Sequence, residues 1–331
     1  MRYVLGVDAG SSKTHALILD EKALALGFGT AGGGNHQASG LIAARAEIER
    51  AAKAALNQAA LLAQAVELGC FCLAGADFPE DYATLQDMIE ALHLVQRVLI
   101  KNDTLAGLRS GVTQPWGVVV NCGSGFNAAG RAPDGREIVN PGLGPLSGDW
   151  HIGGGGSLAW EVIRLVMRAW DGRGQPTLLT QLVLDLFHSP SPEALLRALY
   201  RQEIDRTRLG ELLPLLFEAA EARDEVAQSL LIQLGTEVGI TANALIRRLG
   251  MEKQAVEVVL AGSVFKGKGH LLPETAAHVV HTVAPRARVV RPPYEPVVGA
   301  ALLALEAIGV TISSDQQAQL MQTLPGELRL A

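Results

Sequence analysis

The segment GVDAGSSKT, residues 6–14, constrains the fold most strongly, because it joins two strands through a very short turn. Residues 3–7 are apolar and favour a strand that ends on one carboxylate, Asp8. Gly10 permits a tight turn at low steric cost. A second strand is then expected at residues 14–20, so the chain should begin with a hairpin that has a carboxylate beside its tip.

The turn of this hairpin carries the groups that bind anions. Ser11, Ser12 and Thr14 supply hydroxyls, and Lys13 supplies an ammonium group. Free N–H groups at a hairpin tip form an anion-binding nest, and the carboxylate of Asp8 suits a hydrated Mg²⁺. The segment therefore indicates a nucleotide-phosphate site. An ordinary hairpin with a small polar turn is the alternative reading.

The two halves of the chain repeat one pattern, in which three strands come first. The first half is expected to have the order βββαβαβα. Its strands are expected at residues 3–8, 14–20, 23–28, 66–75 and 96–103, and its helices at residues 41–60, 80–92 and, after residue 103, to about 111. In the second half, strands are expected at residues 116–123, 126–132, 136–140, 255–262 and 287–291. Helices are expected in a block at about 157–250 and then at about 270–283 and 296–308. An internal duplication explains this economically.

Length and composition predict a two-domain globular protein. With 331 residues, two domains are expected, and Gln114-Pro115-Trp116 reads as the joint between a domain 1–115 and a domain 116–309. The net charge of −6 argues against a nucleic-acid partner. No signal peptide and no apolar run of about 18 residues is visible, so no membrane partner and a cytoplasmic location are expected. The three cysteines fit buried, reduced thiols.

Five segments, taken together, resemble the superfamily of sugar kinases, actin and heat-shock ATPases. Within that superfamily the chain is similar to the BadF/BadG/BcrA/BcrD-type ATPases and the N-acetylglucosamine kinases. The segments are, in order, GVDAGSSKT (6–14), GGGN (32–35), KND (101–103), VVNCGSG (119–125) and LAGSVF (260–265).

The resemblance implies a fold and a ligand. The fold is α/β, with two actin-like (ribonuclease H-like) domains, an interdomain nucleotide cleft and a helical insertion at about 157–250 in the second domain. Domain closure on the substrate is implied too. Residues 310–331 would cross back to complete the first domain, and dimers are common in such kinases.

The resemblance also assigns ligand-binding roles to residues of the two turns and the adenosine motif. The phosphates of ATP would be held by Gly10, Ser11, Ser12, Lys13, Thr14, Gly123, Ser124 and Gly125. Mg²⁺ would be held through water by Asp8. Adenosine would be bordered by Gly262, Ser263 and Phe265, where the alternative is a strand-to-helix turn with a core phenylalanine.

Asp103 is the candidate general base. It follows an apolar strand, a usual place for sites in α/β sheets, and could accept the proton of a sugar hydroxyl. The alternative is a helix cap, because Asn102 or Asp103 could start the helix at Thr104. Both roles can hold together.

Four polar residues are expected to bind the sugar: Asn35, His36, Asn127 and Asp149. The sequence departs from its relatives near them. Many N-acetylglucosamine kinases carry G-D-E-G-S, where this chain reads GDWHIGGGGS at 148–157, and Phe126 stands where relatives often have Ser. Asp149 is kept, but Trp150 replaces the acid, which leaves the identity of the sugar open.

Two other functions compete with a hexose or amino-sugar kinase. One is an ATPase that activates a partner enzyme through an iron–sulfur cluster, for which Cys70, Cys72 and Cys122 are poorly placed. The other is a nucleotide-dependent switch or assembly protein without kinase activity. Asp8 and Asp103 favour catalysis over both.

Overall fold

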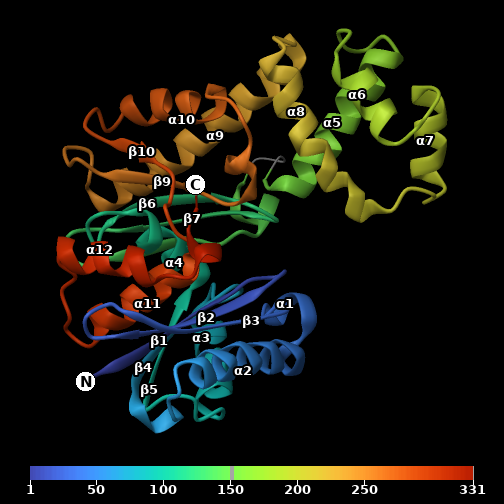
Figure 1. The fold of residues 1–331 in the computed structure, drawn as a ribbon. Coiled ribbons are helices and arrows are strands. Elements are labelled where there is room, and N and C mark those ends of the chain that lie inside the picture. The colour runs from blue at the N-terminus through green and yellow to red at the C-terminus, as the bar shows by residue number, and fades with distance from the viewer. Residues whose placement is uncertain (150–152, 331) are drawn as a thin grey trace.

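A computed structural model describes residues 1–149 and 153–330 of the protein, and it contains two five-stranded sheets (Figure 1). The first sheet has the spatial order β3 (Ala25–Ala31), β2 (Thr14–Asp20), β1 (Tyr3–Ala9), β4 (Val66–Leu73), β5 (Arg97–Asn102). The second sheet has the spatial order β8 (Glu137–Asn140), β7 (Phe126–Arg131), β6 (Gly117–Cys122), β9 (Glu257–Ala261), β10 (Arg288–Val290).

The strand order and direction are the same in both sheets. In each half the first three strands are antiparallel neighbours, and the fourth and fifth strands run parallel to the first. This agreement confirms the predicted α/β fold built from a repeated βββαβαβα unit. It also brings the carboxyl ends of β1, β4 and β5 to one edge of the first sheet, where ligands of such sheets bind.

Two helices lie between the sheets, α4 (Asp103–Gly111) and α11 (Pro296–Ala307), as Figure 1 shows. Their close packing depends on small residues. A Cβ added to Gly299 would stand 2.0 Å from the backbone oxygen of Ala106, and one added to Gly6 would stand 2.2 Å from the backbone nitrogen of Ala301. Neither position admits a side chain, so glycine at each lets α11 touch both α4 and β1.

Helices α2 (Leu41–Gln58) and α3 (Pro79–Glu90) cover the outer face of the first sheet, and the short helix α1 (His36–Ser39) packs against α2. The sequence pattern predicts the third strand at residues 23–28, but β3 runs from Ala25 to Ala31. The reason is packing, because Cβ atoms added to Gly27 and Gly29 would stand 2.2 and 2.1 Å from backbone oxygens of α2. The absence of side chains at Gly27 and Gly29 thus allows α2 to pack closely against β3.

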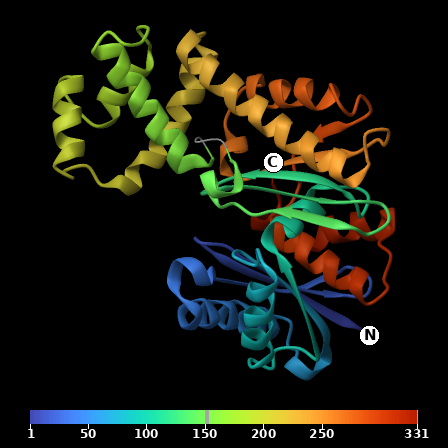
Figure 2. The same cartoon turned by 180° about the vertical axis from the view of Figure 1, so that it is seen from behind.

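Most of the predicted helical insertion projects away from the two sheets, as the view from behind shows (Figure 2). It consists of α5 (Gly155–Trp170), α6 (Leu179–Leu186), α7 (Pro192–Tyr200), α8 (Leu212–Glu221) and α9 (Glu225–Leu249). Helix α9 returns to the second sheet and packs along α10 (Leu271–His281). By length and composition α9 could cross a membrane, but 56% of its apolar window is buried inside the protein, as in a core helix.

The C-terminal segment contacts the first half of the chain. Helix α12 (Ser314–Thr323) lies near β3, and the hydroxyl of Thr323 accepts a hydrogen bond from the Ala25 N–H (3.1 Å). Leu320, Leu324 and Leu328 are buried in one apolar cluster with residues of β1 and β2. The return to the first half begins with α11, before residue 310. The boundaries at 115 and 309 stay predictions.

Candidate active site

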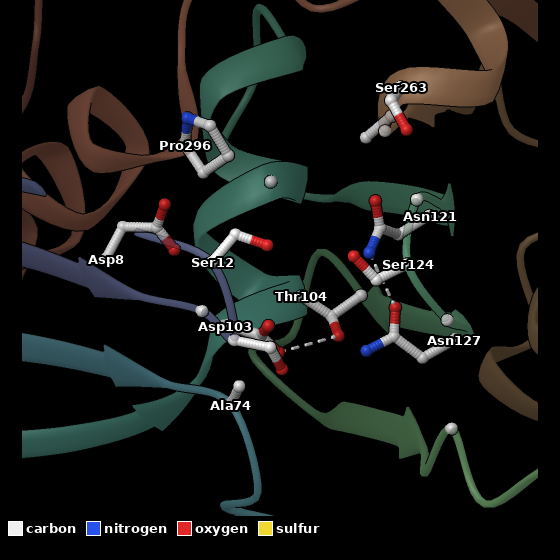
Figure 3. Close-up of a pocket in the computed structure, with 18 of the residues that line it drawn as sticks. Asp8, Ser12, Ala74, Asp103, Thr104, Asn121, Ser124, Asn127, Ser263 and Pro296 are labelled. Carbon is white, nitrogen blue, oxygen red and sulfur yellow. Dashed lines mark hydrogen bonds between the residues drawn. The ribbon is translucent and has the colours of Figure 1, made fainter. Parts of the chain in front are cut away.

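A cavity of about 510 Å³ opens where the two halves meet. It is lined by the β1–β2 turn, the β6–β7 turn, the loop after β4, the first turn of α4 and the start of α11. Figure 3 shows Asp8, Asp103 and Ser124 facing the same space. Ala74 and Asn127 lie toward one end of this space, and Ser263 and Pro296 toward the other.

Most of the predicted phosphate-binding residues of the first turn line the cavity. Gly10, Ser11, Ser12 and Lys13 line it, and the Gly10 N–H closes the turn on the Lys13 carbonyl (3.0 Å). Thr14 does not line it. The Thr14 side chain is buried and donates to the Gly32 carbonyl (2.8 Å), so it holds the end of β3 instead of facing a ligand.

The second turn faces the same cavity from the other half of the molecule. Gly123, Ser124 and Gly125 all line it, and the Gly123 N–H donates to the Gly125 carbonyl (2.9 Å). A Cβ on Gly125 would meet nothing within 4 Å. The backbone of this turn is therefore open to a ligand, as a phosphate-binding turn requires.

The adenosine motif is divided between the cavity and the core. Gly262 and Ser263 line the cavity, whereas Phe265 is buried in the core of the second half. Gly262 has φ 102°, and a Cβ there would stand 2.4 Å from the Cys122 carbonyl oxygen, so only glycine fits. This close contact sets the start of the short helix 263–266 beside the second phosphate turn.

A second cavity of about 490 Å³ adjoins this motif. It shares Ser263 and Lys266 with the first cavity, and α8 contributes Leu213 and Phe217 to its wall. The sequence pattern did not predict this space, because α8 lies far from residue 263 along the chain.

Asp103 is the first residue of α4, and Asn102 is the cap. The Asn102 Oδ1 accepts the Thr104 N–H (3.0 Å), so the capping alternative is met by Asn102 and the Asp103 side chain faces the cavity. Burial and then the charge of Asp77 raise the pKa of Asp103 to about 6, against hydrogen bonds from Thr104. A carboxylate with a pKa raised toward neutrality suits proton transfer.

Asp8 lies near Asp103 at the end of β1. Burial, and then the charge of Asp103, raise the pKa of Asp8 to about 8, and the ammonium of Lys13 offsets part of this rise. Among the described residues no group of three or more His, Cys, Asp or Glu side chains could hold a metal ion by itself. One oxygen ligand with a nearby second carboxylate fits Mg²⁺, which usually keeps several waters and binds through one or two carboxylates and substrate phosphates.

The residues predicted to bind sugar are only partly brought together. Asn35 and Asn127 line the cavity, and the Asn121 amide donates to the Asn127 Oδ1 (3.0 Å), which leaves the Asn127 amide N–H groups for a ligand. The pocket lining does not include His36 or Asp149. The ring of His36 packs under Gly75, and Asp149 accepts the Ser147 hydroxyl (2.6 Å). Trp150 lies outside the described residues.

The sequence pattern did not predict several polar lining residues, among them Gln37, Asp77, Lys266 and Glu295. Asp77 follows the buried strand β4 as Asp103 follows β5, and that position could have revealed it. Glu295 has no comparable signal, since it precedes a proline at the start of α11 and looks like any residue before a helix.

Comparison with known proteins gives matches over nearly the whole chain. The model of the BadF/BadG/BcrA/BcrD ATPase family matches residues 5–304. An N-acetylmuramic acid/N-acetylglucosamine kinase of Clostridium acetobutylicum is 29% identical over 280 residues, which are 83% of this chain and 89% of that protein. An N-acetyl-D-glucosamine kinase of Dictyostelium discoideum is 28% identical over 314 residues, 92% of this chain and 98% of that protein.

A solved structure shares the fold at lower identity. The ROK family glucokinase of Streptomyces griseus, in complex with glucose and AMPPNP, superposes with a TM-score of 0.59. The match covers 92% of this chain and 99% of the glucokinase chain, at 18% identity.

Proposed function

The chain belongs to the BadF/BadG/BcrA/BcrD ATPase family, and on that premise we propose that it transfers the γ-phosphoryl group of ATP to a hydroxyl of an amino sugar. The observation that carries this proposal is the position of Asp103, which faces one cavity together with both glycine-bearing turns. The two relatives at 29% and 28% identity are both named as amino-sugar kinases, which supports the choice of acceptor.

The triphosphate is assigned to the space between the two turns. The Gly10 and Gly123 N–H groups close their own turns, so the backbone N–H groups of Ser11 and Ser12 on one side and of Ser124 and Gly125 on the other would meet its oxygens. Lys13 adds a positive charge at the first turn. Phosphoryl transfer depends mainly on such positioning and charge neutralisation.

The adenosine is assigned to the region from Gly262 to Lys266. Ser263 borders both cavities, and Leu213 and Phe217 give the second cavity an apolar wall that suits a purine ring. The helical insertion thereby contributes α8 to nucleotide binding.

Asp8 would hold Mg²⁺ through water. When bound, the ion neutralises charge on the phosphate oxygens during transfer. The Asp8 carboxylate supplies the hard oxygen ligand that this ion prefers.

Asp103 would remove the proton of the acceptor hydroxyl. Asn35 and Asn127 line the cavity with amide groups that bind hydroxyl or acyl oxygens, and they would orient the sugar. Because the cap role falls to Asn102, the Asp103 carboxylate can turn toward the sugar without loss of the helix cap.

An ADP-release assay across neutral, amino and acylated hexoses tests the proposal. ADP should form only when a sugar acceptor is present, and the product mass should rise by one phosphate. ATP hydrolysis at the same rate with and without every sugar would contradict the kinase and favour a partner-activating ATPase.

A further inference from the structure

Asp77 is a second carboxylate beside the base, held in a fixed place by its surroundings. It lies in the loop between β4 and α3 and lines the cavity. Its backbone N–H and that of Phe78 both donate to Asp81 Oδ2, at 3.3 and 2.9 Å. The capping box of α3 thus fixes the loop that carries Asp77.

Asn102 joins Asp77 to the helix that carries the base. The amide nitrogen of Asn102 donates to Asp77 Oδ1 (3.2 Å) and to the Ala76 carbonyl (3.1 Å), while its oxygen caps α4. Asn102 is 1% exposed, so this connection is screened from water. Asp77 and Asp103 therefore belong to one rigid unit, and a ligand that reaches one carboxylate approaches the other.

Amide side chains and carboxylates surround the end of the cavity near Asp77. Asn35 and Gln37 line it from the segment of α1. The two lysines among the described lining residues, Lys13 and Lys266, both pair with Glu295 at the start of α11. An acidic substituent on the acceptor would face two carboxylates here.

We propose that Asp77 is an acceptor-binding residue that takes a hydrogen bond from a hydroxyl or ammonium group of the sugar and selects against acceptors that carry a carboxylate. This inference rests on the proposed kinase function and names its acceptor class. A carboxylate fixed by Asn102 is a strong acceptor for a donor group. A carboxylate on the sugar would be repelled by Asp77 once both groups lose their water, so the site would select against acidic acceptors.

The test compares three acceptors with the full-length enzyme: N-acetylglucosamine, which is neutral, glucosamine, which carries an amine, and N-acetylmuramic acid, which adds a carboxylate. The wild type should show kcat/KM at least about 10-fold higher for the neutral sugar than for the acid, the value of one lost charge-assisted contact. Asp77→Asn should raise the KM for N-acetylglucosamine about 10-fold, leave the KM for ATP unchanged and narrow the neutral-to-acid ratio several-fold.

Glu80→Gln is the matched control, because Glu80 is an exposed carboxylate of the same segment. It should keep wild-type sugar and ATP constants. Asp77→Glu is the second variant if Asp77→Asn does not fold. It should keep the wild-type ratio of kcat/KM for the neutral sugar to kcat/KM for the acid, with a higher KM for the sugar.

The outcomes separate the two proposals. If no sugar stimulates ADP release by the wild type, the kinase function fails and this inference fails with it. If the wild type phosphorylates sugars but uses the acid as well as the neutral acceptor, or if Asp77→Asn matches Glu80→Gln in every constant, only the role of Asp77 is overturned.

Discussion

The ammonium nitrogen of Lys13 lies 2.9 Å from Oε2 of Glu295, although 282 residues separate them in the chain. The Lys266 ammonium lies 3.5 Å from the other carboxylate oxygen. Burial alone would raise the pKa of Glu295, but the hydrogen bond from Lys13 and the charges of both lysines outweigh it and lower that pKa. Glu295 thus gathers cations from both halves of the molecule at the wall of the cavity.

Glu295→Gln is expected to lower the KM for ATP by roughly 3–10-fold at low ionic strength. The change removes a negative charge that faces the incoming triphosphate and releases two lysines to bind it. The decrease in KM should be smaller at high salt, because screening weakens both the repulsion by Glu295 and the attraction by the two lysines. Glu49→Gln, in an exposed pair with Lys53, is the control. A higher KM in Glu295→Gln would mean that alignment of the lysines outweighs the repulsion.

Asp103→Asn is expected to lower kcat by roughly 10²–10⁴-fold, the usual loss for a missing general base. ATP affinity should stay near that of the wild type, because the proposed role of Asp103 is to act on the acceptor hydroxyl and not to hold the triphosphate. Steady-state kinetics and calorimetric titration with an ATP analogue measure the two effects separately. Turnover like that of the wild type would remove Asp103 from the mechanism.

The sugar-dependent kcat/KM is expected to fall below about pH 6, with a limiting slope of one. The base must be ionised to accept a proton, and the pKa of Asp103 is raised to about 6 by burial and by Asp77. Asp77→Asn removes the charge of Asp77, so the acidic limb of the pH profile of kcat/KM should move to lower pH. The limb of Glu80→Gln should coincide with that of the wild type. A limb of Asp77→Asn at the wild-type position would show that Asp77 does not act on the base.

The sequence was sufficient for the parts of the fold that follow periodicity and turn chemistry. Strand β2 begins and ends as predicted, at Thr14 and Asp20, because apolar residues and turn residues mark both ends. Strand β3 ends at Ala31 and not at the predicted residue 28, since Gly27 and Gly29 allow α2 to pack closely against it. That contact joins distant segments, so no local pattern contains it.

The candidate site was predictable where a strand ends in a polar residue. Asp8 and Asp103 both line the cavity, as their positions suggested. Thr14 and His36 were expected beside them, but the structure directs their side chains elsewhere. Glu295 reaches the cavity only because α11 returns between the two sheets, and a local motif does not encode that return.

Asp8→Asn is expected to stabilise the metal-free protein while it removes Mg²⁺-dependent turnover. The pKa of Asp8 is raised to about 8 by burial and by Asp103, so the folded state binds this proton more tightly than the unfolded state. Ionisation of Asp8 therefore costs stability as pH rises from about 4 to 8. At pH 8 the variant should gain on the order of 1–3 kcal/mol in free energy of unfolding, less than the full pKa shift corresponds to, because Asp8 lines the open cavity.

Urea unfolding at pH 8 and near pH 4, with and without Mg²⁺, measures this gain. The gain should vanish near pH 4, where the carboxyl group is protonated in the folded state. Added Mg²⁺ should stabilise the wild type, because it binds the folded state and offsets the charge of Asp8, and should stabilise Asp8→Asn much less. Equal stabilisation of the two proteins by Mg²⁺ would place the ion elsewhere and separate the raised pKa of Asp8 from metal binding.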